Sequence, residues 1–348
     1  MELTEELVRR TPKVLLHDHL DGGLRPATVR ELAAEVGHLL PADEESALAA
    51  WFHQGGRGAD LARYLEAFDH TVAVLQTPAA ITRVARECGE DLDADGVVYA
   101  EVRYAPELST TGGLELAEVL DAWAAGFAAA PGTIELRMLV CAMRNGDRAG
   151  QVVDAAIAAR DRGLPVVGVD LAGPEVGFPA SRHAAALKRA RAAGLHLTLH
   201  AGEAEGPGSV ADALEQGAER LGHGVRIIED RDATGQLGPI ARRVRDEGTV
   251  LEVCPTSNLH TGVATSYTAH PVQRLREAGF AVTISTDNRL MSGISLTGEL
   301  LAGVRAFGWT LDDLEHLAWT ALAGAFCDEP TRATLAAVIE RGFASVRP

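Results

Sequence analysis

The chain has 348 residues, and 47% of them are hydrophobic, so it can bury a large core as one big domain or two ordinary ones. Its formal net charge of −17 opposes binding to phosphate backbones, and no cluster of Lys and Arg residues offsets that charge. Nucleic acids and anionic membranes are therefore not expected as partners.

The first residues, MELTEELVRRTPKV, contain neither the basic nor the long apolar segment of a secretory signal. No stretch approaches the roughly 20 apolar residues that cross a membrane, so we expect a cytoplasmic protein. The cysteines are far apart and form no C-x-x-C pair, which predicts neither a disulfide framework nor a thiolate zinc site. They are expected to be buried thiols: Cys88, Cys141, Cys254 and Cys327.

Eight short runs rich in β-branched residues are predicted to be strands: 13–21, 96–106, 133–144, 165–175, 195–203, 219–227, 249–258 and 281–288. Two Ala- and Arg-rich stretches between them, 147–163 and 179–194, have helical spacing and close on glycine, as helices commonly do. This alternation indicates an α/β protein with a parallel sheet, and eight units favour a (β/α)8 barrel of the TIM type. A doubly wound open sheet is the alternative, but no G-x-G-x-x-G motif follows the first strand.

Residues 24–95 separate the first two predicted strands by far more than one helix. They are predicted to form several helices, with Thr28 and Thr77 as N-caps. Apolar residues at helical spacing are expected to pack inward: Leu61, Tyr64, Leu65, Phe68, Val72 and Leu75. An insertion that leaves the carboxyl end of the first strand is expected to form a helical lid over the barrel mouth. No linker-like tract divides the chain, so residues 1–348 are expected to form a single domain.

Polar residues cluster where the predicted strands end. In LLHDHLDGG, residues 15–23, His17, His19 and Asp21 alternate along the chain and so project to the same side. Further residues of this kind follow later strands: Asp170, Gly173, Glu175, His200, Glu203, His223 and Asp287. The carboxyl ends of the strands form the catalytic face of such barrels, and imidazole and carboxylate groups bind zinc. Histidines elsewhere are interpreted as structural: His53, His70, His183, His260, His270 and His316.

The motifs HDHLDGG (17–23), DLAGPE (170–175), HAGE (200–203), GHG (222–224), CPTSN (254–258) and STDN (285–288) occur in this order. Together they resemble the adenosine deaminases of the metal-dependent amidohydrolase superfamily, essentially from end to end. The resemblance implies one zinc ion, with a ligand set of His17, His19, His200 and Asp287. It also implies that Glu203 protonates purine N1 and that His223 orients a water and helps to deprotonate it. Asp21 would reach the ribose hydroxyls, and the Gly173 N–H would approach N3.

The implied reaction is the hydrolytic deamination of adenosine, and with it 2′-deoxyadenosine, to inosine and ammonia. Zinc makes hydroxide available near neutral pH, and electron density that builds on the ring at N1 requires an acid there, which is the role expected of Glu203. The two lysines, Lys13 and Lys188, do not stand where a binuclear site would need a carboxylated lysine, so one metal is expected.

Two alternatives stay open at this point. Relatives that act on free adenine resemble H-x-H-x-E-G-T after the first strand, and those that act on methylated AMP resemble H-x-H-x-N-G. Asp21-Gly22-Gly23 favours a nucleoside with a free ribose, yet aminofutalosine or another adenosine-like metabolite remains a candidate substrate. A catalytically silent relative is the alternative from a different class of function. The sequence does not encode the oligomeric state.

One position departs from the best-known members of the family, in which a second aspartate follows the zinc aspartate and contacts purine N7. Here Asp287 is followed by Asn288. An aspartate can donate to N7 only when it is protonated, whereas an amide donates at any pH. We expect Asn288 to contact N7 through its NH2 group; the alternative is that it merely caps the following turn.

Overall fold

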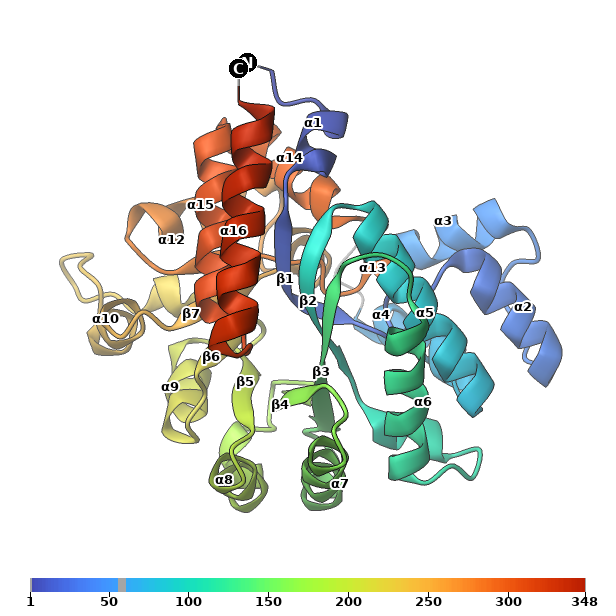
Figure 1. Cartoon of the computed structure of the whole chain (residues 1–348). Helices are drawn as coiled ribbons and strands as arrows, with labels where there is room; N and C mark the ends of the chain where they lie inside the picture. Colours follow the sequence, from blue (N-terminus) through green and yellow to red (C-terminus); the bar gives the residue numbers. More distant parts are fainter. Residues whose placement is uncertain (1, 56–60, 348) are drawn as a thin grey trace.

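The computed structural model describes residues 2–55 and 61–347 and contains a nearly closed parallel barrel (Figure 1). Its strands pair in chain order and in parallel: β1 (Lys13–His19), β2 (Val97–Tyr104), β3 (Glu135–Met143), β4 (Val166–Ala172), β5 (His196–Ala201), β6 (Arg220–His223), β7 (Val250–Val253) and β8 (Val282–Ile284). A bridge between Asp18 and Asp287 joins the end of β8 to β1. The predicted (β/α)8 barrel is confirmed.

Helices surround this barrel: α1 (Glu5–Arg10), α2 (Pro26–Val36), α3 (Glu45–Gly55), α4 (Leu61–Val74), α5 (Pro78–Ala94), α6 (Leu116–Ala129), α7 (Ala149–Asp161), α8 (Ala184–Ala192), α9 (Pro207–Glu215), α10 (Pro239–Asp246), α11 (Pro255–His260), α12 (Val272–Glu277), α13 (Arg289–Ser292), α14 (Leu296–Phe307), α15 (Leu311–Gly324) and α16 (Glu329–Val346). Short 3-10 turns lie at 106–110, 180–183, 225–229 and 267–269. The helices predicted at 147–163 and 179–194 correspond to α7 and α8.

All eight strands are shorter than the runs predicted for them, and two of them end early for a clear local reason. The run predicted to 227 ends at His223, because Gly224 takes a left-handed conformation with φ of 68°. The run predicted to 258 ends at Val253, because Pro255 occupies the first position of α11 and favours the start of a helix. The second truncation places the CPTSN motif in the segment that leaves the barrel, whereas Gly222 and His223 of the GHG motif are the last residues of β6.

The predicted insertion forms α2, α3, α4 and α5, which gather on one side of the barrel in Figure 1. The predicted cap of α5 is confirmed, since the Thr77 side chain accepts from Ala80 N at 3.2 Å. The predicted cap at Thr28 is wrong. Helix α2 already begins at Pro26, which is pre-organised for a first helical position, so Thr28 lies inside the first turn and donates to Glu87 Oε2 at 2.6 Å.

The apolar stripe of the insertion is described only in part. Leu75 is fully buried and Phe68 packs against the core, while the side chains of Leu61, Tyr64 and Leu65 lie outside the described part of the structure. Helix α3 packs against α13, which follows the end of β8. The insertion therefore borders the carboxyl-end face of the barrel; that it closes over a substrate stays a prediction.

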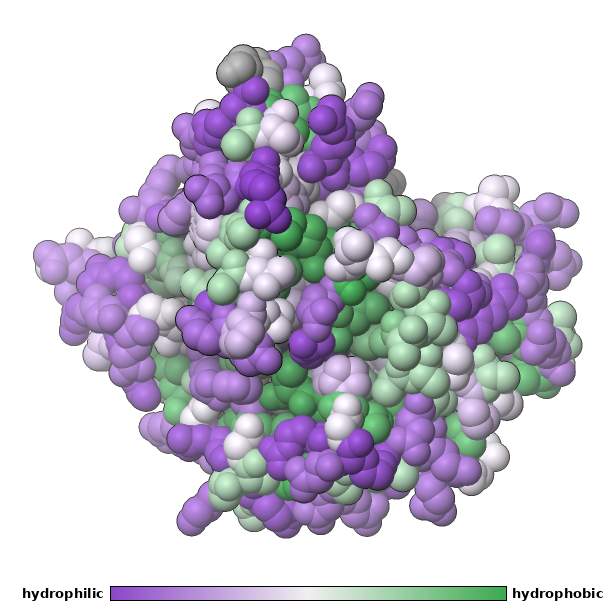
Figure 2. Space-filling view, viewed as in Figure 1, coloured by the Kyte–Doolittle hydropathy of each residue, from purple (hydrophilic) through white to green (hydrophobic). Residues whose placement is uncertain are grey.

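The core and surface follow the usual separation of apolar and polar side chains. Cys88, Cys141 and Cys254 are buried free thiols, as predicted, whereas Cys327 is only partly buried. Hydrophilic residues cover much of the face shown in Figure 2. In the part of the chain that the structure describes, each helix is too short or too polar to cross a membrane.

Candidate active site

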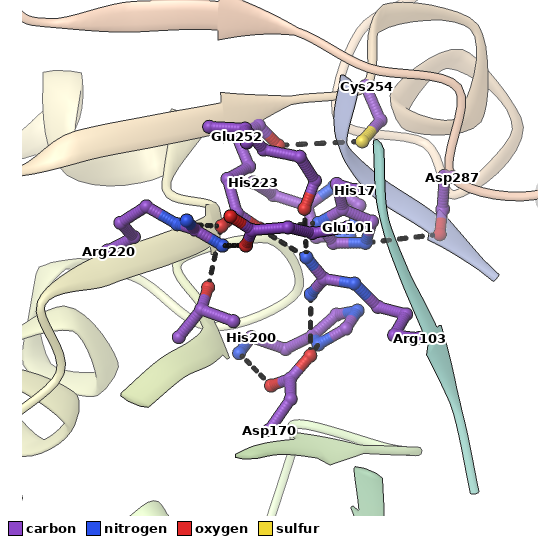
Figure 3. Close-up of polar contacts among 12 residues, drawn as sticks. His17, Glu101, Arg103, Asp170, His200, Arg220, His223, Glu252, Cys254 and Asp287 are labelled. Atoms are coloured by element: carbon purple, nitrogen blue, oxygen red, sulfur yellow. Dashed lines mark hydrogen bonds and ion pairs between the residues drawn. The ribbon is translucent and has the colours of Figure 1, made fainter. Parts of the chain in front are cut away.

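Four metal-binding groups meet at the carboxyl-end face, from β1, β5, β6 and the turn after β8 (Figure 3). Each offers one ligand atom, and these atoms lie within 4.8 Å of one another: His17, His200, His223 and Asp287. His19 joins them, because its Nε2 is 3.3 Å from Asp287 Oδ1 and 3.3 Å from His200 Nε2. The structure thus brings the four expected ligands together and places a further imidazole, that of His223, beside them.

The backbone is strained at two of these residues. Among the described residues other than glycine, only His223 and Asp287 have positive φ, of 60° and 58°. Asp287 is held by β1 on both sides: its N–H donates to His17 O at 3.0 Å, and its carbonyl accepts from His19 N at 2.6 Å. The closing contact between β8 and β1 therefore aims the Asp287 carboxylate at the imidazoles.

Close packing also explains a glycine of the GHG motif. A Cβ at Gly222 would lie 3.1 Å from His17 Cε1 and 3.1 Å from the Cα of His200. A residue with a Cβ would therefore have to displace these neighbours by a few tenths of an ångström, which disfavours larger residues at this position.

The protonation states suit a metal ion. Burial lowers the pKa of His17 to about 4 and that of His19 well below its ordinary value, so both imidazoles are neutral at neutral pH. Although burial opposes ionisation, the surrounding imidazoles, that of His17 first, stabilise the carboxylate and hold the pKa of Asp287 well below its ordinary value. For His200, burial is outweighed by Asp170, which raises the pKa, so a metal would displace a proton there.

One buried nitrogen is aimed at the centre of this cluster. His17 Nε2 lies 3.3 Å from Asp287 Oδ1 but makes no hydrogen bond. A buried imidazole nitrogen without a hydrogen bond, facing an ionised carboxylate and further imidazoles, fits a metal ion. The second oxygen, Asp287 Oδ2, accepts from Ser257 Oγ at 2.6 Å, which leaves Oδ1 for the cluster.

Glu203 lies at the edge of the cluster, in the loop after β5. Its Oε1 accepts from Asn258 Nδ2 at 3.0 Å and from Thr261 Oγ1 at 2.9 Å. Its Oε2 is 3.5 Å from His223 Nε2, and its side chain is 20% exposed. The predicted acid therefore stands next to the metal-binding groups, where a substrate can reach it.

The loop that carries Glu203 is fastened by Glu175. This buried carboxylate accepts the backbone N–H groups of four successive residues and the Ser209 hydroxyl; the four are Gly202, Glu203, Ala204 and Glu205. Although burial opposes ionisation, these donors lower the pKa of Glu175 below its ordinary value. Glu175 was predicted to face the site, but the sequence did not indicate this fastening role.

Asn258 connects Glu203 to His223 and was missed as a site residue. Its Nδ2 also lies 3.2 Å from His223 Nδ1, so that nitrogen accepts and the hydrogen of a neutral imidazole stands on Nε2. His270, interpreted from the sequence as structural only, supports Asn258 through a 3.2 Å contact between His270 Nε2 and Asn258 Oδ1. Asn258 is the last residue of the CPTSN motif and His270 follows it, so this motif was the feature of the sequence that could have indicated them.

The three predicted substrate-binding residues follow the ends of β1, β4 and β8. Burial raises the pKa of Asp21 to about 7, and its buried Oδ1 lies 3.9 Å from His19 Nδ1 without a hydrogen bond. Gly173 follows β4 with φ of 92°, a conformation that favours glycine. Asn288 stands at the N-cap position of α13, although its side chain makes no capping hydrogen bond there; its contact with N7 stays a prediction.

A parallel barrel with buried imidazoles, an ionised carboxylate and a separate glutamate at its carboxyl-end face has the architecture of a metal-dependent hydrolase. The comparisons narrow this class. The family model described as adenosine deaminase matches residues 12–341, and the chain belongs to that family.

Its relatives share this family over nearly their full lengths. The adenosine deaminase of Mycolicibacterium vanbaalenii is 50% identical over 93% of this chain and 92% of its own length. Adenosine deaminase 1 of Streptomyces coelicolor is 48% identical over 98% of this chain and 89% of its own. Among solved structures, an amidohydrolase from Burkholderia ambifaria with bound Zn superposes with a TM-score of 0.86 at 25% identity, covering 99% of this chain and 95% of that one.

Proposed function

We propose that this protein is a zinc-dependent enzyme that deaminates adenosine, and with it 2′-deoxyadenosine, to inosine and ammonia. The observation that carries the proposal is the meeting of three imidazoles and Asp287 at the barrel's carboxyl end, with Glu203 beside them. Relatives that are 46–50% identical over most of the chain and are named adenosine deaminase support this substrate.

One zinc ion would be held by His17, His19, His200 and Asp287. When bound, zinc lowers the pKa of a water so that hydroxide is available near neutral pH. His223 would stand outside this ligand set: if Asn258 Nδ2 donates to its Nδ1, a neutral His223 imidazole carries its hydrogen on Nε2. In this tautomer the Nε2–H would donate to the attacking water and orient it. Help in deprotonating that water would need the other tautomer, with the hydrogen on Nδ1, and stays a prediction.

Glu203 would bind the purine through N1 and deliver a proton there while C6 is attacked. Asn258 and Thr261 hold one oxygen of the Glu203 carboxyl, which leaves Oε2 for the ring nitrogen. The proton on N1 lowers the cost of placing electron density on the ring, and ammonia then leaves C6.

The remaining contacts would fix a small purine nucleoside. Asp21 would bind ribose hydroxyls, and its buried, partly protonated carboxyl can donate as well as accept. The Gly173 N–H would approach N3, and the Asn288 NH2 would donate to N7. No nucleic acid or membrane takes part in this proposal.

A substrate panel tests the assignment. Purified protein is incubated with adenosine, 2′-deoxyadenosine, adenine, AMP and aminofutalosine, and ammonia release is followed, with Glu203→Gln as a control for contaminating activity. Adenosine and 2′-deoxyadenosine should give the highest kcat/KM. Preference for aminofutalosine would reassign the substrate, and no release from any compound would favour a catalytically silent relative.

A further inference from the structure

Two of the proposed zinc ligands are each held from behind by a buried carboxylate. His17 Nδ1 is 3.0 Å from Glu252 Oε2, and His200 Nδ1 is 2.8 Å from Asp170 Oδ2. Each imidazole therefore presents its Nε2 to the cluster. Carboxylates in this position fix the orientation and tautomer of a metal-binding histidine.

The same two carboxylate oxygens bind one guanidinium (Figure 3). Arg103 donates through Nη1 to Asp170 Oδ2 at 2.6 Å and through Nη2 to Glu252 Oε2 at 2.6 Å. A third bond runs from Nη2 to the carbonyl of Leu16 at 2.7 Å, next to His17 in β1. The result is one connected chain from His17 through Glu252, Arg103 and Asp170 to His200. Hydrogen bonds form every link but the last, where an ion pair joins Asp170 Oδ2 to His200 Nδ1 and the backbone N–H of His200 donates to Asp170 Oδ1 at 3.1 Å.

Arg103 is fully buried on β2, and its hydrogen bonds go to Asp170, Glu252 and the Leu16 carbonyl, none of which is a proposed ligand. Its planar fork suits two acceptors at a fixed separation, which a lysine ammonium cannot match.

We propose that Arg103 is a positioning residue of the metal site, which couples His17 to His200 by fixing the carboxylates behind both. The inference rests on the proposed function, because it needs the metal that these histidines would bind. It predicts that Arg103 sets the affinity and the geometry of the site, without direct contact to the ion.

A second buried arginine provides a matched control. Arg220 also binds Glu252, but through Oε1 at 2.7 Å, which is the oxygen turned away from His17. Its other donors bind Glu101 and the carbonyl of Gly324, and its guanidinium stacks on Phe326 at 3.6 Å. Arg220 is as buried as Arg103 yet touches only one of the two carboxylates.

The test compares zinc affinity, by chelator competition, in the native full-length protein and in Arg103→Lys and Arg220→Lys. Arg103→Lys should raise the Kd for zinc about 10- to 100-fold. Its cobalt-substituted form should show an altered visible spectrum, because the imidazoles reorient. Arg220→Lys should keep a Kd and a cobalt spectrum close to the native ones. Circular dichroism of the metal-free proteins checks the fold.

If Arg103→Lys does not fold, a double-mutant cycle with Asp170→Asn and Glu252→Gln takes its place. Losses of zinc affinity that fall short of additivity support the coupling through Arg103, and additive losses overturn it. A native Kd and cobalt spectrum in Arg103→Lys would also overturn it, as would equal effects in Arg220→Lys. A native protein that binds no zinc would instead overturn the metal site of the proposed function, and this inference with it.

Discussion

Replacing Glu175 by Gln tests how the Glu203 loop is held. The native carboxylate accepts from Gly202 N at 2.6 Å with Oε1, and from Ala204 N at 2.7 Å and Glu205 N at 3.0 Å with Oε2. A glutamine has one acceptor oxygen, so its NH2 group must face at least one of these backbone donors. If the amide oxygen takes the Oε2 position, the Gly202 N–H loses its acceptor.

A buried donor that loses its acceptor costs about 1–3 kcal/mol. If the loss of this bond displaces Glu203 and raises the free energy of the transition state by the same amount, kcat falls about 5- to 150-fold. Zinc content should stay native, because Glu175 touches none of the proposed ligands.

The assay is steady-state deamination of adenosine together with zinc analysis of the same preparation. Ser209→Ala is the matched control: it removes one donor to Glu175 and leaves the carboxylate and the four backbone bonds in place. It should retain nearly native kcat. A native kcat in Glu175→Gln, combined with a lower free energy of unfolding, would refute the reasoning and leave Glu175 with a role in stability alone.

Four further predictions address single groups. Glu203→Gln should retain zinc and lose at least about 10²-fold in kcat; near-native turnover would eliminate its role as the acid. His223→Ala should lower turnover far more than zinc content, whereas equal losses would make His223 a ligand. If Asn288 donates to N7, 7-deazaadenosine should be a markedly poorer substrate than adenosine, by about 1–3 kcal/mol in kcat/KM. The Asn288→Asp variant should lose activity as pH rises. If the analogue is turned over as well as adenosine and the pH profile of the variant is unchanged, the contact is ruled out. Burial raises the pKa of Glu299 in the native protein to about 8. In the unfolded chain the Glu299 carboxyl ionises at a lower pH, so the native protein loses stability as pH rises toward 8. Glu299→Gln should therefore gain stability relative to the native protein by up to about 1.4 kcal/mol per pH unit between pH 5 and 8, and a pH-independent difference in urea denaturation would contradict this.

The sequence predicted the barrel and its catalytic face because both follow from local patterns. His17 and His19 alternate within one strand, and His200 and His223 stand at the ends of short β-branched runs. Parallel strands bring these ends to one edge whatever the details of packing. Correct strand assignments were therefore enough to predict that these residues lie together.

The residues behind the cluster could not be assigned in the same way. Arg103 and Glu252 are 149 residues apart, and their pairing depends on which barrel strands face each other across the interior. The signal that was present is the spacing of Glu101 and Arg103, two charged residues on one face of an apolar strand. Charges that are fully buried are normally paired, so such a strand predicts partners without naming them.

Local capping was also predicted incompletely. Thr28 and Thr77 both precede helical patterns, but only Thr77 lies directly before its helix, because Pro26 starts α2 earlier. The cytoplasmic location, the single-domain organisation and the closing of the lid stay predictions.

Titration of metal-free protein with zinc tests the central claim most directly. Adenosine deamination should be absent without metal, rise in proportion to added zinc and reach its maximum at one zinc per chain. Full activity in the metal-free protein, a requirement for two zinc ions, or no deamination of adenosine at saturating zinc would contradict the account.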